Sequence, residues 1–416
     1  MENVAMTSKY GSDEIEILTG LEAVRRRPGM YIGNTDLRGL HCLLDIVLDN
    51  AVEEAIAGEC TQIEVDLNAD GSVVVTDNGR GIPTDIRLKT GKSFLESIMT
   101  QLWAPKSPNP YRHFYKIEGS LRGGGVTIVN ALSEWLEATI WQNDRQFFQR
   151  YERGETVTSL QVTPNPENRR GRAIAFQPDP QMLTTTRFDS TLLAIRLHEL
   201  AYLNPGLRLV LRDRRLERIG RTPHIDTFYY PNGIADYLTQ VNASPTLPSD
   251  IFHLKTQRDR IQVEVALRWR IPSEVEYRQI LHFFPCTAIF GQAFQKSFHP
   301  GRNLYDALHL TSFANQVRTI DGGTHVEGLK RGIVRAVEVL HPLPGSNIEQ
   351  KWQQVRSGWM GIVAVLVPDP EYNGPMKSKL SNQDVEESVT ALVEPSLLEY
   401  LSARPEVIEN PLDLGS

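Results

Sequence analysis

The sequence predicts an α+β fold, in which a two-layer domain over residues 1–225 precedes an α/β domain over residues 226–416. Two observations predict the first domain. One helix, from Leu40 to Ala57, repeats apolar residues at intervals of three and four, and a β-hairpin follows it. In the second half, strands and helices alternate beyond a turn-rich junction at 221–233, which is typical of an α/β layer.

The spacing of apolar residues and the positions of turn-forming residues predict further elements in the first half. Gly58 ends the long helix, because glycine readily adopts the left-handed conformation found there. In chain order, the sequence predicts a polar arm at 1–14, a helical segment from Ile15 to Arg27, hairpin strands Gln62–Leu67 and Ser72–Thr76, a helix from Val126 to Leu132, and three or four strands through Phe176.

The second half contains five well-patterned elements. They are a helix from Gly233 to Val241, a strand from Ile261 to Arg270, a helix from Thr324 to Leu340, a strand from Met360 to Val367, and a helical region from Gln383 to Leu401. The segment 271–306 is aromatic-rich, and its apolar residues follow neither the helical nor the strand repeat, so the sequence predicts no structure for it.

Composition narrows the class of protein. The chain has 416 residues, of which 40% are hydrophobic and 23% charged, as in ordinary globular proteins of two or three domains. Its 44 basic and 51 acidic residues give a net charge of −7, which argues against nonspecific nucleic-acid binding by the whole surface. The segment from Arg208 to Arg221 is the best candidate for a local basic face, although a solvated strand and loop has the same composition.

Cysteine use and hydropathy suggest a compartment. Cys42, Cys60 and Cys286 form no CxxC pair, and their odd number argues against a disulfide framework. No run of 18 apolar residues occurs, and the first residues lack the apolar centre of a signal peptide. We therefore expect a cytoplasmic protein without a membrane-spanning helix.

A candidate recognition corner closes the second hairpin strand. Residues Asp77 to Pro83 have the sequence DNGRGIP. The strand would hold the Asp77 carboxylate in place, and Gly79 and Gly81 would let a flat ligand approach the backbone. Because an ionised carboxylate only accepts hydrogen bonds, Asp77 suits an exocyclic amine such as that of adenine.

Two neighbouring segments suit a metal ion and phosphates. Asn50 lies on the polar side of the long helix, and its amide oxygen is a ligand type that Mg²⁺ accepts; a solvated acidic helix face is the alternative. The run Gly119 to Gly125 (GSLRGGG) leads directly into a helix, where backbone N–H groups can hold phosphates. A flexible loop has the same composition. Residues 103–116 could fold over a ligand as a lid.

Taken in order, these segments resemble the GHKL-type ATP-binding fold shared by DNA gyrase B, one class of heat-shock chaperones, MutL and histidine kinases. Flanking motifs are similar to gyrase B or its topoisomerase IV counterpart. They are GLEAVRRRPGMYIG at 20–33, VNALS at 129–133, LNPGLRLVLRDR at 203–214, DGGTH at 321–325 and VPDP at 367–370. The resemblance spans roughly residues 10–400. It implies a nucleotide domain followed by a transducer domain of the ribosomal protein S5 domain 2-like type.

The resemblance also implies ATP and Mg²⁺ as ligands, with roles for particular residues. Asn50 would ligate Mg²⁺, Asp77 would accept from the adenine amine, and Glu54 would pair with Arg80 at the pocket mouth. Lys377 would reach the terminal phosphate. The other implied nucleotide-binding residues are Tyr10 on the arm, Gly81, Ile82 and Pro83, Lys106 and Tyr115 near the lid, and Gly119, Ser120, Leu121, Arg122, Gly123, Gly124, Gly125 and Val126.

The chain departs from the family at the position of the general base. The family has a glutamate one helical turn before the Mg²⁺-binding Asn, and this chain has Ile46, which cannot deprotonate water. Asp45 is adjacent, but one residue on a helix is a rotation of about 100°, so it should face elsewhere. We group the remaining departures with the phosphate end: Cys42 in place of the helix's second His, Ser120, Arg122 and Gly124 in the loop, Arg172 where a Thr is usual after Gly171, and Pro375 and Met376 before Lys377.

These departures favour a chain that binds ATP but hydrolyses it weakly; tolerated drift with another base is the alternative. Three functions stay open: an ATP-dependent homodimerisation module whose closed state a gyrase or topoisomerase subunit recognises, the ATPase half of a split DNA topoisomerase, and a nucleotide-free scaffold or regulator. No EGDSA signature or DxD pair follows residue 370, so we do not expect this polypeptide alone to cleave DNA. Whether it contacts DNA stays open.

Overall fold

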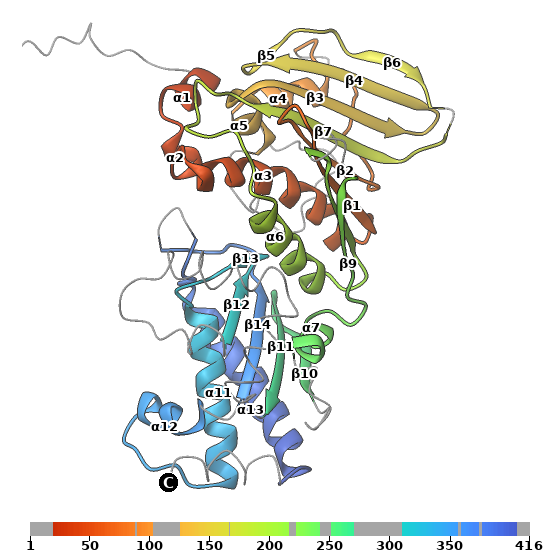
Figure 1. The fold of residues 1–416 in the computed structure, drawn as a ribbon. Coiled ribbons are helices and arrows are strands. Elements are labelled where there is room, and N and C mark those ends of the chain that lie inside the picture. Colours follow the sequence, from red (N-terminus) through yellow and green to blue (C-terminus); the bar gives the residue numbers. More distant parts are fainter. Residues whose placement is uncertain are drawn as a thin grey trace, which may run out of the picture.

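The computed structural model describes residues 20–87, 90–102, 125–165, 167–215, 222–241, 251–269, 310–356, 359–373 and 377–405. These residues form two stacked domains, each built on one β-sheet with a buried apolar core (Figure 1). The predicted α+β class is confirmed. The division at residue 225 stays a prediction; the first sheet itself continues through strand β9, His224–Phe228.

The first sheet is mostly antiparallel and has the order β5-β4-β3-β7-β2-β1-β8-β9, with β6 beside β4. Only the β1–β8 pair is parallel among its described strands. The bounds are β1 Gln62–Leu67, β2 Val73–Asp77, β3 Ser133–Gln142, β4 Arg145–Glu152, β5 Glu155–Thr156, β6 Gln161–Pro164, β7 Gly171–Pro178 and β8 Arg208–Asp213. The predicted hairpin is β1–β2. Five strands, rather than three or four, follow the glycine-rich segment, because β5 has only two residues and the exposed β6 lacks an alternating pattern.

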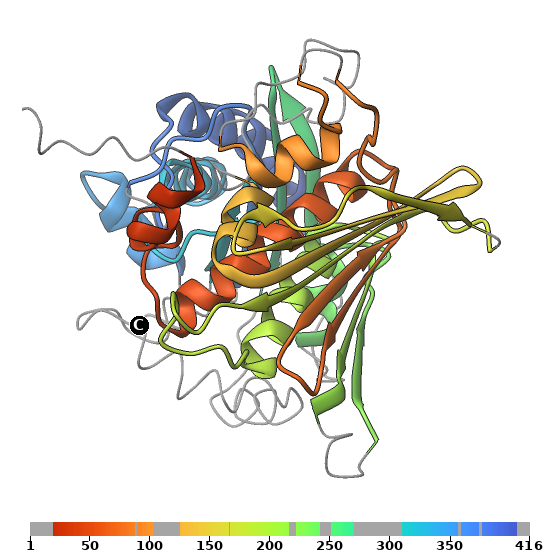
Figure 2. The ribbon, with the colours of Figure 1, turned by 90° about the horizontal axis from the view of Figure 1, so that it is seen from above.

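Helices cover one face of this sheet, as the view from above shows (Figure 2). They are α1 Leu21–Arg26, α2 Gly29–Ile32, α3 Leu37–Ile56, α4 Phe94–Thr100, α5 Val126–Ala131 and α6 Ser190–Leu203. The long predicted helix is α3. The Asp36 side chain accepts a hydrogen bond from the Arg38 N–H at its start, and Gly58, at φ 79°, follows its end.

The second domain packs helices on a five-stranded sheet of order β10-β11-β14-β12-β13. The bounds are α7 Ile234–Val241, β10 Ile251–Arg258, β11 Ile261–Trp269, β12 Leu310–Ala314, β13 Val317–Arg318, α11 Thr324–Leu340, α12 Ile348–Val355, β14 Trp359–Leu366 and α13 Gln383–Ser402. The five predicted elements are all present. Helices α11 and α13 lie side by side (Figure 1), closely enough that a Cβ at Gly328 would be 2.5 Å from the Glu386 carbonyl oxygen. The segment 271–306 lies outside the described residues.

None of the helices in the described ranges combines the length and the apolar composition that crossing a membrane requires.

Candidate functional site

Three elements that carry predicted site residues meet in the first domain. Helix α3 contacts both β2 and α5. It carries Asn50 and Glu54, β2 ends at Asp77, and Gly125 is the residue before α5. The predicted residues 10, 106, 115 and 119–124 lie outside the described residues, as do 375 and 376. The described site is therefore the part built by α3, the end of β2 and the start of α5.

Glu54 and Arg80 form the ion pair expected from the sequence. The Arg80 Nε and Nη2 atoms donate to the two carboxylate oxygens of Glu54, at 2.9 and 3.1 Å. The Arg80 backbone N–H also donates to Glu54, at 3.2 Å. The Glu54 side chain is buried, and Arg80 is more exposed. This bidentate contact attaches the segment after β2 to the last turns of α3.

The glycines of this segment are required by the protein's own packing. A Cβ at Gly79 would lie 2.9 Å from Asp77 Oδ1, and one at Gly81, where φ is 78°, would lie 2.9 Å from the Ile140 side chain. Ile82 is buried beside them, and Pro83 is half-buried. The sequence analysis assigned Gly79 and Gly81 to close approach of a ligand. The structure provides a second reason for them, which is close approach of neighbouring side chains.

Asp77 is buried, at 4% exposure, and both its oxygens accept hydrogen bonds. Oδ1 accepts from the Gly79 N–H at 2.9 Å, and Oδ2 accepts from the Arg172 Nε at 2.7 Å. Arg172 Nη2 also donates to the backbone oxygen of Asn50, at 2.6 Å. Grouping Arg172 with the phosphate end was therefore wrong, because its guanidinium lies on the carboxylate predicted to recognise the base.

The reason is the strand register. Arg172 on β7 lies directly opposite Asp77 on β2, so the two side chains point to the same face of the sheet. Ile174 and Phe176, two and four residues further along β7, are buried on that face. The sequence contained this signal, since Arg172 alternates with the apolar positions of a predicted strand, but pairing of β7 with β2 was needed to interpret it.

Asn50 meets the requirements of a Mg²⁺ ligand in part. It is half-buried, and its side-chain amide makes no hydrogen bond within the described residues. One neutral oxygen suits Mg²⁺, which keeps several waters and binds phosphate oxygens. No group of three or more acidic, His or Cys residues that could hold a metal occurs in the described ranges. Asn50 therefore fits a metal that is held mainly by a substrate and water.

Ile46 is packed into the core. It lies one turn before Asn50 on α3 and is only 3% exposed. The neighbouring carboxylates contact Arg196 of α6, whose Nε is 3.5 Å from Asp45 and whose Nη2 is 3.2 Å from Asp49. Asp45 is thus directed to α6, as the helix geometry predicted. Arg196 is a residue that the sequence analysis missed.

The Lys377 side chain lies against Tyr372 in the second domain. Its Nζ lies 5.6 Å from the centre of the Tyr372 ring, and the Tyr372 hydroxyl donates to the Ala314 oxygen at 2.9 Å. Its own backbone has φ 52°, an uncommon conformation for a side-chain-bearing residue. These contacts place the ammonium group beside an aromatic face at the end of the second sheet.

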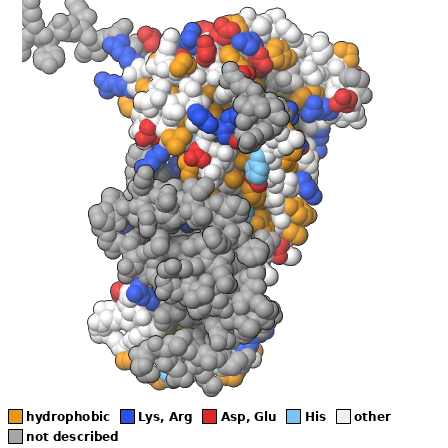
Figure 3. All heavy atoms as spheres, in the orientation of Figure 1, with side chains coloured by type: hydrophobic (Ala, Val, Ile, Leu, Met, Phe, Trp, Pro, Cys, Tyr) orange, Lys and Arg blue, Asp and Glu red, His pale blue; other side chains and the backbone are white. Residues whose placement is uncertain are grey.

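The basic segment beginning at Arg208 has acidic partners in the neighbouring strand. Arg212 donates to Glu64 at 2.8 Å, and Arg214 donates to Asp66 at 2.8 Å. Residues 216–221 lie outside the described residues. On the face seen in Figure 3, basic and acidic side chains are interspersed over the first domain. Arg212 and Arg214 are therefore paired with carboxylates of β1, and the strand that carries Arg212 is largely buried.

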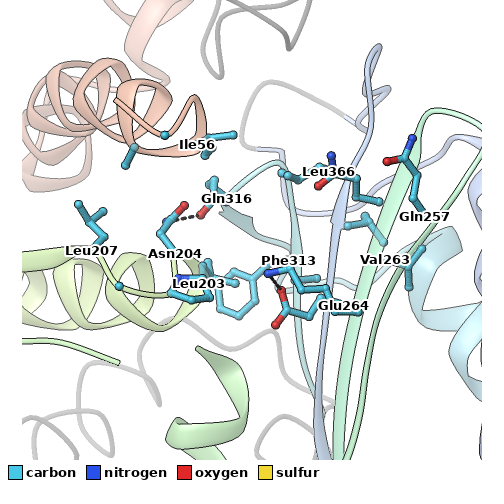
Figure 4. Close-up of a pocket in the computed structure, with 18 of the residues that line it drawn as sticks. Ile56, Leu203, Asn204, Leu207, Gln257, Val263, Glu264, Phe313, Gln316 and Leu366 are labelled. Carbon is cyan, nitrogen blue, oxygen red and sulfur yellow. Dashed lines mark hydrogen bonds and ion pairs between the residues drawn. The ribbon is translucent and has the colours of Figure 1, made fainter. Parts of the chain in front are cut away.

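A separate cavity of about 740 Å³ lies between the two domains (Figure 4). Its walls combine apolar side chains from both sheets and their helices, including Ile56, Leu203, Val263, Phe313 and Leu366. Four of its polar side chains contact one another in pairs. Asn204 donates to Gln316 at 3.0 Å, and Lys255 pairs with Glu264 at 2.9 Å. The cavity therefore marks the joint between the domains and presents no evident ligand chemistry.

The fold and this arrangement of α3, β2 and α5 define a class of protein. The family model described as "Histidine kinase-, DNA gyrase B-, and HSP90-like ATPase" matches residues 35–166, which include all three elements. A second model, described as "DNA gyrase B", matches residues 302–413. In both matched segments the chain is similar to DNA gyrase B.

Individual relatives show the same similarity to DNA gyrase B. The chain is 41% identical to the DNA gyrase B protein of Synechocystis sp. over 97% of this chain and 34% of that protein. It is 36% identical to the DNA gyrase B protein of Thermotoga maritima over 97% of this chain and 59% of that protein. The 43K ATPase domain of Thermus thermophilus gyrase B, solved with an aminocoumarin, matches with a TM-score of 0.70 and 29% identity, covering 95% of this chain and 93% of that one. The chain spans only 34% to 59% of the lengths of the curated relatives it matches.

Proposed function

We propose that this protein is a cytoplasmic ATP-binding module that dimerises when nucleotide is bound and hydrolyses ATP weakly. The similarity to DNA gyrase B and the match of the ATPase model to residues 35–166 support nucleotide binding. Asn50 would ligate Mg²⁺, Asp77 would accept from the base, and Gly125 and Val126 would hold phosphates with the preceding loop. Lys377 would bring its positive charge to the terminal phosphate. Bound Mg²⁺ supplies charge neutralisation for the phosphates.

The observation that carries weak hydrolysis is the packing of α3. Ile46 occupies the position one turn before Asn50 and is buried among apolar side chains. Asp45 and Asp49, the nearest carboxylates along this helix, both contact Arg196. A general base has to lie within hydrogen-bonding reach of the water it activates. We therefore infer that neither Ile46 nor the carboxylates beside it on α3 supply one.

Dimerisation through the arm that carries Tyr10 is part of the same proposal. Two copies would associate while nucleotide is bound and would separate slowly, because turnover is slow. A gyrase or topoisomerase subunit would then recognise the associated state. The similarity to DNA gyrase B supports the general class of partner. Contact with DNA is not required by the proposal.

Substitution Ile46→Glu tests this function. We expect the wild-type chain to bind ATP with Mg²⁺ and to turn it over very slowly, and Ile46→Glu to raise turnover by about 10² or more, since a general base typically contributes 10²–10⁴-fold. Calorimetry measures binding, and phosphate release measures turnover. Ile46→Gln has similar size and polarity but no basic carboxylate, so it should stay slow. Brisk hydrolysis by the wild type, or equal rates in both variants, would remove the proposal's central feature.

The Arg172–Asp77 contact favours a second candidate, a nucleotide-free scaffold or regulator, because it occupies the predicted base-recognition carboxylate. The two candidates differ in ligand-linked stability. Nucleotide at 100 times its Kd should add about 2.7 kcal/mol to the free energy of unfolding of a binding protein. A melting temperature that is unchanged by saturating ATP and Mg²⁺ would support the scaffold.

A further inference from the structure

The ion pair of Arg172 and Asp77 is a built part of the first domain. Both side chains are buried, with 11% and 2% of their surface exposed, and the contact is 2.7 Å long. A Cβ at Gly171 would lie 1.9 Å from the Asp77 carbonyl oxygen, so glycine is needed for the two strands to lie this close. Arg172 also donates to the Asn50 oxygen on α3. One guanidinium thus joins β2, β7 and the helix that carries the predicted metal ligand.

This pairing changes the electrostatics of base recognition. An unpaired carboxylate attracts the 6-amino group of adenine and repels the 6-oxo group of guanine, because it only accepts hydrogen bonds. A guanidinium stays charged in proteins, so Arg172 cancels the net charge of Asp77 at hydrogen-bonding distance. Both the attraction of the amine and the repulsion of the oxo group then become weaker.

We propose that Arg172 is a specificity-determining residue that lowers the affinity for ATP and the discrimination between adenine and 6-oxopurine nucleotides. The proposal rests on the proposed nucleotide-binding function and adds a ligand class to it: purine nucleoside triphosphates in general. Arg172 acts through Asp77, and its second hydrogen bond, to the Asn50 backbone oxygen, restrains that turn of α3.

Calorimetric titration of the full chain with ATP and with GTP, each with Mg²⁺, tests the proposal. For the wild type we expect dissociation constants for the two nucleotides within about threefold of each other, because a neutral pair discriminates little. Arg172→Thr removes the guanidinium. ATP should then bind about tenfold tighter and GTP no tighter, since a hydrogen bond to an unpaired charged group exceeds one to a neutral group by roughly that factor.

Arg170→Thr is the matched control. It removes a guanidinium two residues away whose partner is Glu59, at 2.6 Å on the exposed surface. It should leave both affinities unchanged. If Arg172→Thr does not fold, Arg172→Gln removes the charge but keeps a donor for Asp77, and it should shift the ratio of the two constants in the same direction.

The outcomes separate the role of Arg172 from the proposed function. Strong preference of the wild type for ATP over GTP, or an Arg172→Thr variant with unchanged or weaker ATP binding, overturns the role of Arg172 and leaves the proposed function standing. Absence of binding by the wild type and by every variant overturns the proposed function, and the role of Arg172 with it. A tenfold gain for ATP in Arg172→Thr and none in Arg170→Thr supports the proposal.

Discussion

At the scale of single residues, burial sets the ionisation of several side chains. Burial, together with the charge of Asp77, raises the pKa of the Cys60 thiol to about 11. Burial lowers the pKa of His198 to about 4 and that of His325 to about 3. All three groups are therefore neutral at pH 7. His325 contacts the Thr319 hydroxyl, and His198 contacts the Tyr230 hydroxyl within an aromatic cluster at the joint between the domains.

His198 predicts a dependence of stability on pH. Its folded pKa, about 4, is below the ordinary value of 6.5, so the unfolded chain binds the proton more readily. The stabilisation is present above pH 6.5 and is lost as pH falls toward 4. Between pH 6.5 and 5 the residue should lower the free energy of unfolding by about 1.5 kcal/mol, because the slope reaches about 1.4 kcal/mol per pH unit only well below pH 6.5. Urea unfolding at several pH values measures this.

Variant His198→Phe isolates the effect. It keeps an aromatic ring but cannot titrate, so its free energy of unfolding should fall less steeply below pH 6.5 than that of the wild type. Equal slopes in His198→Phe and the wild type would show that His198 is accessible to protons in the folded state.

At the scale of elements, the well-patterned helices that the sequence predicted are present, because their own residues determine them, whereas helices α2, α4, α6 and α12 were not predicted. The prediction for α11, Thr324 to Leu340, matches its observed bounds, and α3 begins three residues before the predicted Leu40 because Asp36 caps it. Contacts between distant elements were not predictable in this way. Arg172 meets Asp77 only after β7 pairs with β2, and Arg196 meets α3 only after α6 packs against it. The candidate site was thus predicted as residue types and not as a network.

The turn before α11 holds the segment that carries Lys377. The Thr324 N–H donates to the Leu380 oxygen, the Leu380 N–H donates to the Gly322 oxygen, and the Asp321 N–H donates to the Ser378 oxygen, at 2.8 to 3.1 Å. Gly323 lies at the centre of this contact with φ 138°. A Cβ there would be 2.3 Å from the Leu380 oxygen. The DGGTH motif therefore acts as a positioning element for Lys377.

Gly323→Ala should disrupt this element. The new methyl group clashes with the Leu380 backbone, and the φ value is unfavourable for alanine, so we expect a loss of about 2 kcal/mol or more in the free energy of unfolding. ATP affinity should fall as well, because the Lys377 segment is displaced. Gly206→Ala is the control: its φ is also positive, at 82°, but nothing lies within 4 Å of the position that the new methyl group would take. Equal losses in both variants would mean that backbone strain, not the Leu380 contact, sets the cost.

At the scale of the whole molecule, polar contacts join the two domains. Arg318 of β13 donates to the Glu199 side chain of α6 at 2.8 Å. Arg196 of α6 donates to the backbone oxygen of Gln316, also at 2.8 Å. Because Arg196 also contacts Asp49 of α3, a continuous chain of contacts links the helix of Ile46 and Asn50 to the turn between β12 and β13. A movement of α3 on nucleotide binding would be transmitted to the second domain along this chain.

Breaking the joint should separate the unfolding of the domains. Apolar packing continues from the first core to Phe313 and Ile362 of the second sheet, so we expect one calorimetric transition for the wild type. Arg318→Met leaves the buried Glu199 without this partner and should cost about 2 kcal/mol, enough to split the transition in two. Arg335→Met breaks a more exposed pair with Glu394 between α11 and α13, and it should keep one transition. A single, unshifted transition in Arg318→Met would show that apolar contacts alone couple the domains.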